Sequence, residues 1–234
     1  MPALPNDHEE RILDLMGRHL FSIPPVTHRV CSEPDGLPLG ATYSALARLR
    51  KRGYLGEEKL YGTGREVYHH LTPRGAVHLG LPPSIGHGFD NLHVRAHHLG
   101  QLLFCCGRVQ RPKFTGSEFT RIFPGHLEAG SELRKRFHSD AYFLDETNGV
   151  RRLGRILVDT GGNMLKTMEK ALAVAALTLT PFVRERRFTL AVVFPTHAKM
   201  RHFRYCLRQS PSLDGVHVIL DAQPALLPLV ATAL

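Results

Sequence analysis

Apolar side chains recur with helical spacing in two segments near the start of the chain. Residues 8–21 show this spacing behind an acidic first turn, which is typical of a helix N-terminus. Residues 42–52 place Leu46 and Leu49 on one face and basic side chains largely on the others. We therefore expect two amphipathic helices here, with a short helix at residues 26–31 between them.

The pattern changes to that of a strand pair after the second helix. Residues 55–60 and 66–71 predict the two strands of a hairpin, and Gly62 and Gly64 supply the positive φ angles that its turn needs. Thr72 precedes a Pro-Arg-Gly run, which predicts a helix N-cap followed by proline at the first helical position.

The second half of the chain alternates between apolar strands and helices. Helices are expected at residues 91–106, 163–179 and 198–209. Strands are expected at residues 138–144, 153–158, 188–194 and 216–220. The first two strands flank an Asn-Gly turn and predict a hairpin, and the alternation that follows predicts parallel pairing around a central sheet.

A segment rich in proline and glycine separates the two halves. We expect an N-terminal domain over residues 1–82, a linker over 83–90 and an α/β domain over 91–234. The overall class is α/β, or α+β when both domains are counted together. Phe114, Phe119 and Phe123 follow the helix at 91–106 among basic residues, and we favour core anchors over a stacking surface for single strands.

Charge and composition narrow the class of partner. The 234-residue chain has a formal net charge of +9 and a sequence pI of about 9.7. Such a surplus favours double-stranded DNA or another polyanion over a membrane, for which no span or signal segment is apparent. Four cysteines without paired spacing indicate a reducing, cytoplasmic setting.

The order of helix, basic helix, hairpin and helix start resembles a winged helix-turn-helix domain. In that arrangement the basic helix enters the major groove and the hairpin follows the phosphate backbone. The predicted DNA-contacting residues are Thr42, Tyr43, Arg48, Lys51, Arg52, Lys59, Arg65 and His69. The alternative is an assembly factor in which a domain of this shape binds protein.

Two acids followed by a lysine-bearing helix resemble the layout of restriction-endonuclease-like metal sites. Asp140 and Asp159 are the candidate carboxylates, and Lys166 and Lys170 lie one turn apart on the helix that follows. Carboxylates bind Mg²⁺, and a lysine near the attacked phosphate balances charge.

Most of the chain resembles the replication-relaxation family of plasmids and integrative elements. The matching stretches are RLRKRGYL at 48–55, HSDAYF at 138–143, LVDTGG at 157–162, and VVFPT at 192–196. The resemblance implies a winged helix joined to a restriction-endonuclease-like α/β domain, and thus a transcriptional, replication or mobilisation regulator of a mobile element.

The chain departs from the family at its second metal-binding strand. Leu157 stands where the family carries glutamate, and Gly161 stands where the alternative register calls for lysine. We therefore expect a nuclease-like domain that has lost catalysis and supports DNA binding or dimerisation as a homodimer, with no cofactor. Asp159 would then accept hydrogen bonds from the amides of Gly161 and Gly162. The alternative is a Mg²⁺-dependent relaxase or nuclease that uses Asp140 and Asp159.

Overall fold

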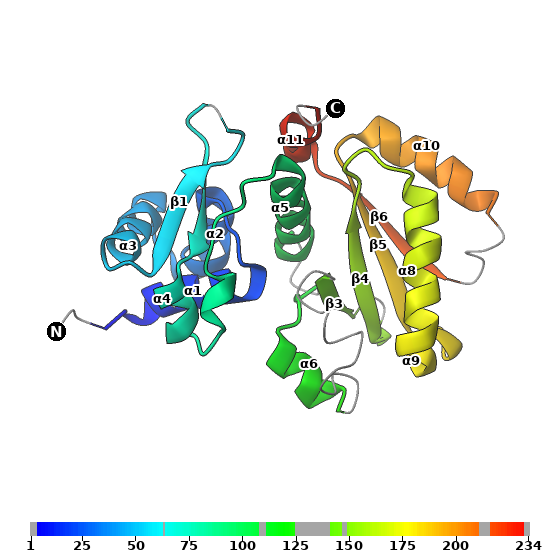
Figure 1. Ribbon diagram of the computed structural model, residues 1–234, viewed down its shortest axis with the longest axis horizontal. Helices are drawn as coiled ribbons and strands as arrows, with labels where there is room; N and C mark the ends of the chain where they lie inside the picture. Colours follow the sequence, from blue (N-terminus) through cyan, green and yellow to red (C-terminus); the bar gives the residue numbers. More distant parts are fainter. Residues whose placement is uncertain are drawn as a thin grey trace. The chain divides into compact units, whose positions relative to one another are not determined.

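The computed structural model of the chain describes residues 4–62, 64–107, 111–124, 141–146, 149–210 and 216–231. The chain is mixed α/β. Its internal contacts divide it into two compact units, Met1–Leu102 and Leu103–Leu234, which we call the N-terminal and C-terminal units (Figure 1).

Helices and one hairpin make up the N-terminal unit. Its elements are α1 (Asp7–His19), α2 (Pro24–Cys31), α3 (Leu39–Lys51), β1 (Leu55–Lys59), β2 (Val67–Leu71), α4 (Pro73–His78) and the first turns of α5 (Leu92–Cys106). Two short 3-10 helices lie at Glu33–Asp35 and Pro83–Ile85. The predictions of two amphipathic helices, a short helix between them and a hairpin are confirmed.

The first helix begins at a reciprocal cap. The Asn6 side chain accepts a hydrogen bond from the Glu9 backbone amide, and the Glu9 side chain accepts one from the Asn6 amide. These two bonds satisfy amides that the first turn leaves unpaired. The apolar face of α1, which includes the fully buried Ile12 and Met16, then packs within the unit among α2 and α3.

The hairpin is antiparallel, with Leu55 opposite Leu71. Gly62 and Gly64 in its turn have φ angles of 77° and 86°, a region that favours glycine. Thr72 follows β2 and caps α4, because its hydroxyl oxygen accepts a hydrogen bond from the Gly75 amide at 3.1 Å. Both features agree with the sequence prediction.

The division between the units lies later in the chain than we expected. The segment 83–90 packs on the N-terminal unit: a Cβ at Gly86 would lie 2.3 Å from the carbonyl carbon of Thr72. The Phe89 amide donates to the Tyr68 hydroxyl at 2.8 Å, and Arg95 of α5 donates to the Lys59 carbonyl at 2.7 Å. The prolines and glycines therefore indicate an irregular backbone in this segment. They do not mark a domain boundary, because the segment still packs on the N-terminal unit.

A four-stranded sheet organises the C-terminal unit, with strand order β3-β4-β5-β6. The strands are β3 (Ala141–Asp145), β4 (Arg152–Val158), β5 (Phe188–Phe194) and β6 (His217–Ala222). The helices are the last turns of α5, α6 (Gly116–Ile122), α8 (Met164–Thr178), α9 (Thr180–Arg184), α10 (His197–Arg208) and α11 (Leu227–Ala231). β3 and β4 pair antiparallel, whereas β4, β5 and β6 are parallel, as predicted.

One face of the sheet carries the main core of this unit. Met168 of α8 and Phe203 of α10 pack there with Leu190 and Val192 of β5, and these two helices cover the same face (Figure 1). Phe114 and Phe119 are buried in the same cluster, which confirms that they are core anchors.

Candidate nucleic-acid interface

The outward face of α3 is largely uncharged over its first turns. Tyr43 is 50% exposed, and Ser44 and Ala47 are also at the surface, while Ala45, Leu46 and Leu49 face the core. A cation appears on the outward face only near the C-terminal end, at Lys51 and its neighbours. The exposed face of α3 therefore carries an aromatic and small side chains in its first turns and positive charge near its C-terminal end.

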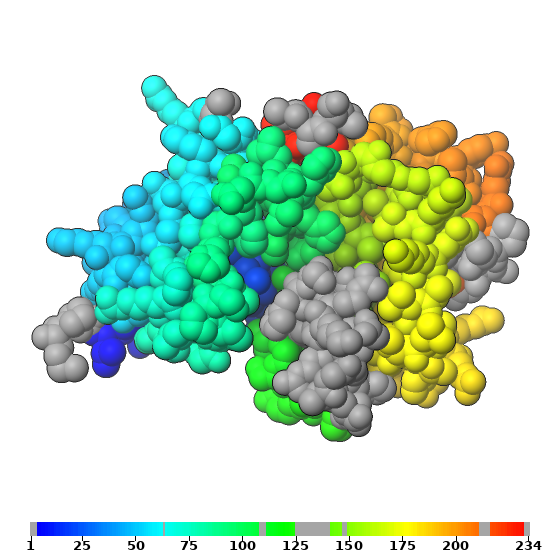
Figure 2. Space-filling view, in the orientation of Figure 1, coloured from blue at the N-terminus to red at the C-terminus, as the bar shows by residue number. Residues whose placement is uncertain are grey.

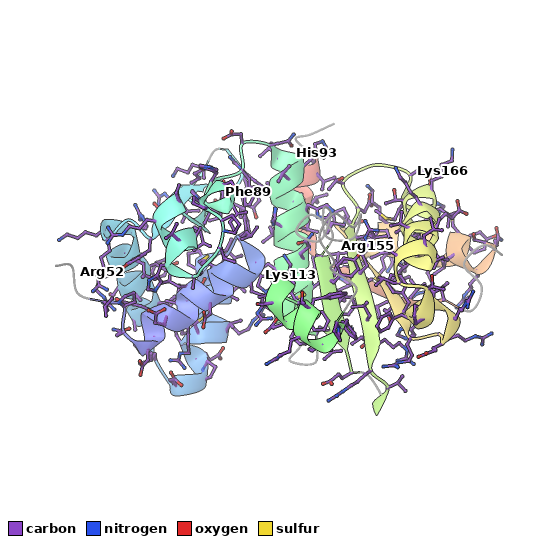
Figure 3. All side chains as sticks on the ribbon, turned by 60° about the horizontal axis from the view of Figure 1, so that its bottom comes forward. Arg52, Phe89, His93, Lys113, Arg155 and Lys166 are labelled. Atoms are coloured by element: carbon purple, nitrogen blue, oxygen red, sulfur yellow. The ribbon has the colours of Figure 1, made fainter. Side chains whose placement is uncertain are left out.

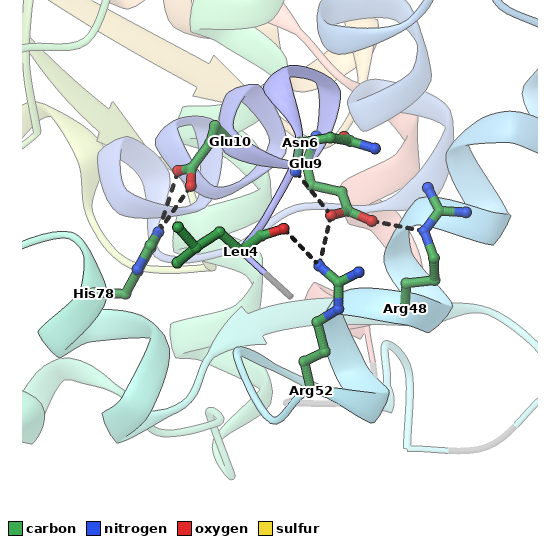
Figure 4. Close-up of polar contacts among 7 residues, drawn as sticks. All are labelled: Leu4, Asn6, Glu9, Glu10, Arg48, Arg52 and His78. Carbon is green, nitrogen blue, oxygen red and sulfur yellow. Dashed lines mark hydrogen bonds and ion pairs between the residues drawn. The ribbon is translucent and has the colours of Figure 1, made fainter. Parts of the chain in front are cut away.

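Two of the predicted DNA contacts, Arg48 and Arg52, bind a buried carboxylate (Figure 4). Arg48 Nε donates to Glu9 Oε1 at 2.6 Å, and Arg52 Nη1 donates to Glu9 Oε2 at 2.8 Å. The Glu9 side chain is 1% exposed, against 46% for Arg48 and 23% for Arg52. The acid thus ties the first helix to the basic end of α3, and Arg48 keeps the larger accessible part of its side chain.

The charge state of Glu9 follows from these contacts. Burial alone would raise the pKa of its carboxyl, but the hydrogen bonds from Arg48 and from the Asn6 amide and the charges of both arginines outweigh that effect. The pKa is therefore lowered, and Glu9 is an anion at neutral pH. The contact of Glu9 with the two arginines could not be predicted from the sequence. Acidic residues in the first turn of a helix are already explained by their favourable interaction with the helix N-terminus.

Two further predicted contacts, Thr42 and His69, lie inside the unit. Thr42 is fully buried, and its hydroxyl lies 2.6 Å from the Ser32 hydroxyl and 3.1 Å from His28 Nδ1. His69 is 2% exposed because Ser22 pairs with it along the outer side of β2. Neither side chain is available to a phosphate in this structure.

Burial also keeps His69 neutral. It lowers the pKa of the imidazole to about 4, with Arg50 adding to the shift and Glu57, 3.2 Å away, opposing it. A neutral, buried imidazole cannot balance a phosphate charge at neutral pH. The ring is instead buried, with its Nε2 3.2 Å from Glu57 of β1.

The lowered pKa of His69 predicts a loss of stability in mild acid. The unfolded chain takes up a proton near pH 6.5, whereas the folded chain resists it until about pH 4. Stability is therefore present above pH 6.5 and lost as the pH falls towards 4, by on the order of 2 kcal/mol. Urea unfolding between about pH 7 and pH 5, above the range where Glu9 titrates, should show a smaller loss in His69→Gln than in the native chain. A substitution at exposed His87 is the control, and equal pH profiles for the native chain and His69→Gln would contradict the assignment.

Acids on β1 are neutralised within the unit. Arg50 Nη1 donates to Glu57 Oε2 at 2.6 Å, and Glu58 contacts the Tyr68 hydroxyl at 2.5 Å and Arg95 at 3.4 Å. In the described part of the chain, by contrast, no ion pair engages the exposed cations Lys51, Lys59 and Arg65. The free positive charge of this surface thus lies at the end of α3 and along the hairpin.

A groove of about 340 Å³ lies where α3 and the hairpin meet. Tyr43 of α3, the prolines that begin α2, and Tyr61 and Arg65 of the hairpin turn contribute to its wall. Its lining is mostly apolar, with Arg65 and Glu66 as the charged residues.

In the C-terminal unit, Asp159 has a structural explanation. It follows β4, and its Oδ1 accepts a hydrogen bond from the Gly161 amide at 3.0 Å, one of the two bonds expected for a structural role. Its other oxygen lies 3.4 Å from Lys199 Nζ of α10. Lys199 was not among the predicted site residues, because the sequence does not show that α10 begins beside the end of β4.

Lys166 and Lys170, two other residues of the predicted metal site, form no ion pair with Asp159. Lys166 and Lys170 are exposed on α8, and Lys166 projects outwards, whereas Arg155 lies within the body of the unit (Figure 3). Asp140 lies outside the described residues. Among those that are described, no group of three or more histidine, cysteine, aspartate or glutamate residues is placed to hold a metal ion.

Comparisons of the chain with protein-family models, with curated proteins and with solved structures find no match. Across the described residues, no helix combines the length and the apolar character needed to span a bilayer.

Proposed function

We propose that this protein binds double-stranded DNA through its N-terminal unit, which acts as a winged helix-turn-helix. The observation that carries the proposal is the distribution of charge. Glu57 and Glu58 of β1 pair with Arg50 and Arg95, whereas Lys51, Lys59 and Arg65 face solvent, with Glu66 as the exposed acid beside Arg65. Exposed, unpaired cations on a helix end and a hairpin suit a row of phosphates.

The order of elements supports the same proposal. Three helices precede a hairpin, and Ser22 between α1 and α2 pairs with β2 as a short third edge. In a winged helix the helix before the hairpin reads the major groove, which gives α3 that role here. Tyr43 and Ser44 would then face base edges, and Lys51 and the hairpin cations would face the backbone.

The resemblance to the replication-relaxation family gives this binding a biological context. We propose a transcriptional, replication or mobilisation regulator of a mobile element, with the C-terminal unit as a nuclease-like domain that no longer cleaves DNA. The ion pair of Asp159 with Lys199 and its bond from Gly161 support a structural role for that acid. Nicking of supercoiled DNA with Mg²⁺ that disappears in Asp159→Ala would contradict this part of the proposal.

The phosphate role of Lys51 and Arg65 predicts a change in salt dependence. Removing one phosphate contact should lower the slope of log K against log salt by about 0.9, so Lys51→Gln with Arg65→Gln should lower it by about 2. The measurement is fluorescence anisotropy of a labelled duplex at several salt concentrations. Arg74→Gln, at an exposed cation of α4 in the same unit, controls for the loss of net charge.

The outcomes of this experiment distinguish direct phosphate contacts by Lys51 and Arg65 from an effect of the protein's net charge. We expect the double variant to weaken binding to random and preferred duplexes alike, because phosphates carry no sequence information. If the double variant retains the native slope, Lys51 and Arg65 do not contact the backbone. If Arg74→Gln lowers the slope as much per charge removed, net charge alone explains the effect.

A further inference from the structure

The outward face of α10 in the C-terminal unit is strongly cationic. Arg201, Arg204 and Arg208 recur at intervals of three and four residues, and all three are exposed. They therefore share a stripe about 10 Å long on one side of the helix. Tyr205, 63% exposed, stands beside this stripe.

The apolar side of α10 is already covered by its own unit. Phe203 is buried, and its ring lies 5.1 Å from that of Phe194 on β5. Met200 and Leu207 pack against the same core cluster. The helix therefore keeps its position through its apolar residues, and its arginines do not serve to anchor it. In the space-filling view α10 forms open surface of the C-terminal unit (Figure 2).

Nothing in the described part of the chain neutralises the three arginines. The helix contains no acid, and no ion pair with a described residue engages Arg201, Arg204 or Arg208. Lys199 differs from them, because it pairs with Asp159 at 3.4 Å. Three like charges on one stripe repel each other, which costs stability unless an anionic partner compensates them.

We propose that this arginine stripe, Arg201, Arg204 and Arg208, is a second DNA-binding surface that contacts the phosphate backbone of a duplex. Guanidinium groups match phosphate oxygens with paired donors, and their regular spacing along one helix face suits a repeating anion. A membrane surface fits less well: an interfacial helix inserts its apolar side into lipid, and here Met200, Phe203 and Leu207 are used inside the protein. The inference does not depend on the N-terminal unit binding DNA.

The test is neutralisation of the stripe in the full chain. Arg201→Gln, Arg204→Gln and Arg208→Gln are combined, and binding to a labelled duplex of random sequence, about 30 base pairs long, is followed by anisotropy at several salt concentrations. We expect the salt slope to fall by about 2 to 3 and affinity near 0.1 M salt to fall about tenfold or more. The same three positions changed to lysine should retain most of the binding. Circular dichroism verifies that each variant is folded.

A matched control removes three exposed arginines elsewhere in the C-terminal unit that also lack an ion pair with a described residue: Arg121→Gln, Arg184→Gln and Arg186→Gln. Equal slopes for the stripe variant and this control would overturn the inference, as would failure of the native chain to bind the duplex. A stripe variant that keeps duplex binding but no longer sediments with phosphatidylserine vesicles would also overturn it, in favour of a lipid surface. The Lys51 and Arg65 variant separates the two proposals, because it removes the contribution of the N-terminal surface to the salt slope and leaves that of the arginine stripe unchanged.

Discussion

Replacement of Glu9 by glutamine is expected to destabilise the N-terminal unit by about 2–3 kcal/mol. The carboxylate is buried and accepts charge-assisted hydrogen bonds from Arg48 and Arg52 and a third bond from the Asn6 amide. The amide that replaces it carries no charge and turns an NH₂ group towards one of these donors. Because both arginines keep some access to water, the expected loss is below that for a fully buried charge left unpaired.

Glu10→Gln provides the matched control, one residue further along the same helix. Glu10 is 40% exposed and pairs with His78 at 3.0 Å, so its loss should cost less than about 1 kcal/mol. Urea unfolding followed by circular dichroism measures both variants at neutral pH. Similar shifts for Glu9→Gln and Glu10→Gln would contradict the assignment of Glu9 as the internal anchor of α3.

Substitution of Gly75 by alanine is expected to be at least as damaging, by about 3 kcal/mol. A Cβ at this position would lie 2.2 Å from the Tyr54 carbonyl oxygen and 3.2 Å from Leu71 Cδ2. That carbonyl accepts hydrogen bonds from the Thr72 amide at 3.0 Å and from its hydroxyl at 3.2 Å. The backbone cannot move away without breaking these bonds, so α4 would be displaced from the hairpin.

Gly40→Ala tests whether the effect comes from packing or from helix propensity. Gly40 lies in the first turn of α3, and no atom lies within 4 Å of an added Cβ. Alanine should therefore stabilise the chain there by up to about 1 kcal/mol. Thermal unfolding of the two variants should move in opposite directions. A stable Gly75→Ala protein would show that α4 does not pack on Tyr54 as described.

The helices and strands could be predicted from the sequence because each depends on residues that lie within or next to it. The positive φ of Gly62, the cap at Thr72 and the apolar run of β5 all act within a few residues. The antiparallel hairpin of β3 and β4 was predicted from its Asn-Gly turn, and the parallel pairing that follows was predicted from the alternation of strands and helices. The specific family of each unit remains a proposal, since element order alone is shared by proteins with different functions.

The candidate site was harder to predict because tertiary contacts decide it. A basic residue on the outer side of α3 looks free until Glu9, far away in sequence, is brought beside it. His69 looks like a surface cation until Ser22 covers its strand. Lys199 becomes the partner of Asp159 only because parallel strands bring α10 to the end of β4.

Amide hydrogen exchange of the full chain, with and without a DNA duplex, tests DNA binding by the N-terminal unit at the level of its elements. We expect slower exchange on binding at the start of α3, around Tyr43, and in the hairpin turn near Tyr61 and Arg65. Added protection at α10 would be due to the second surface. Unchanged exchange at α3 and the hairpin in a complex that has formed would contradict DNA binding by the N-terminal unit.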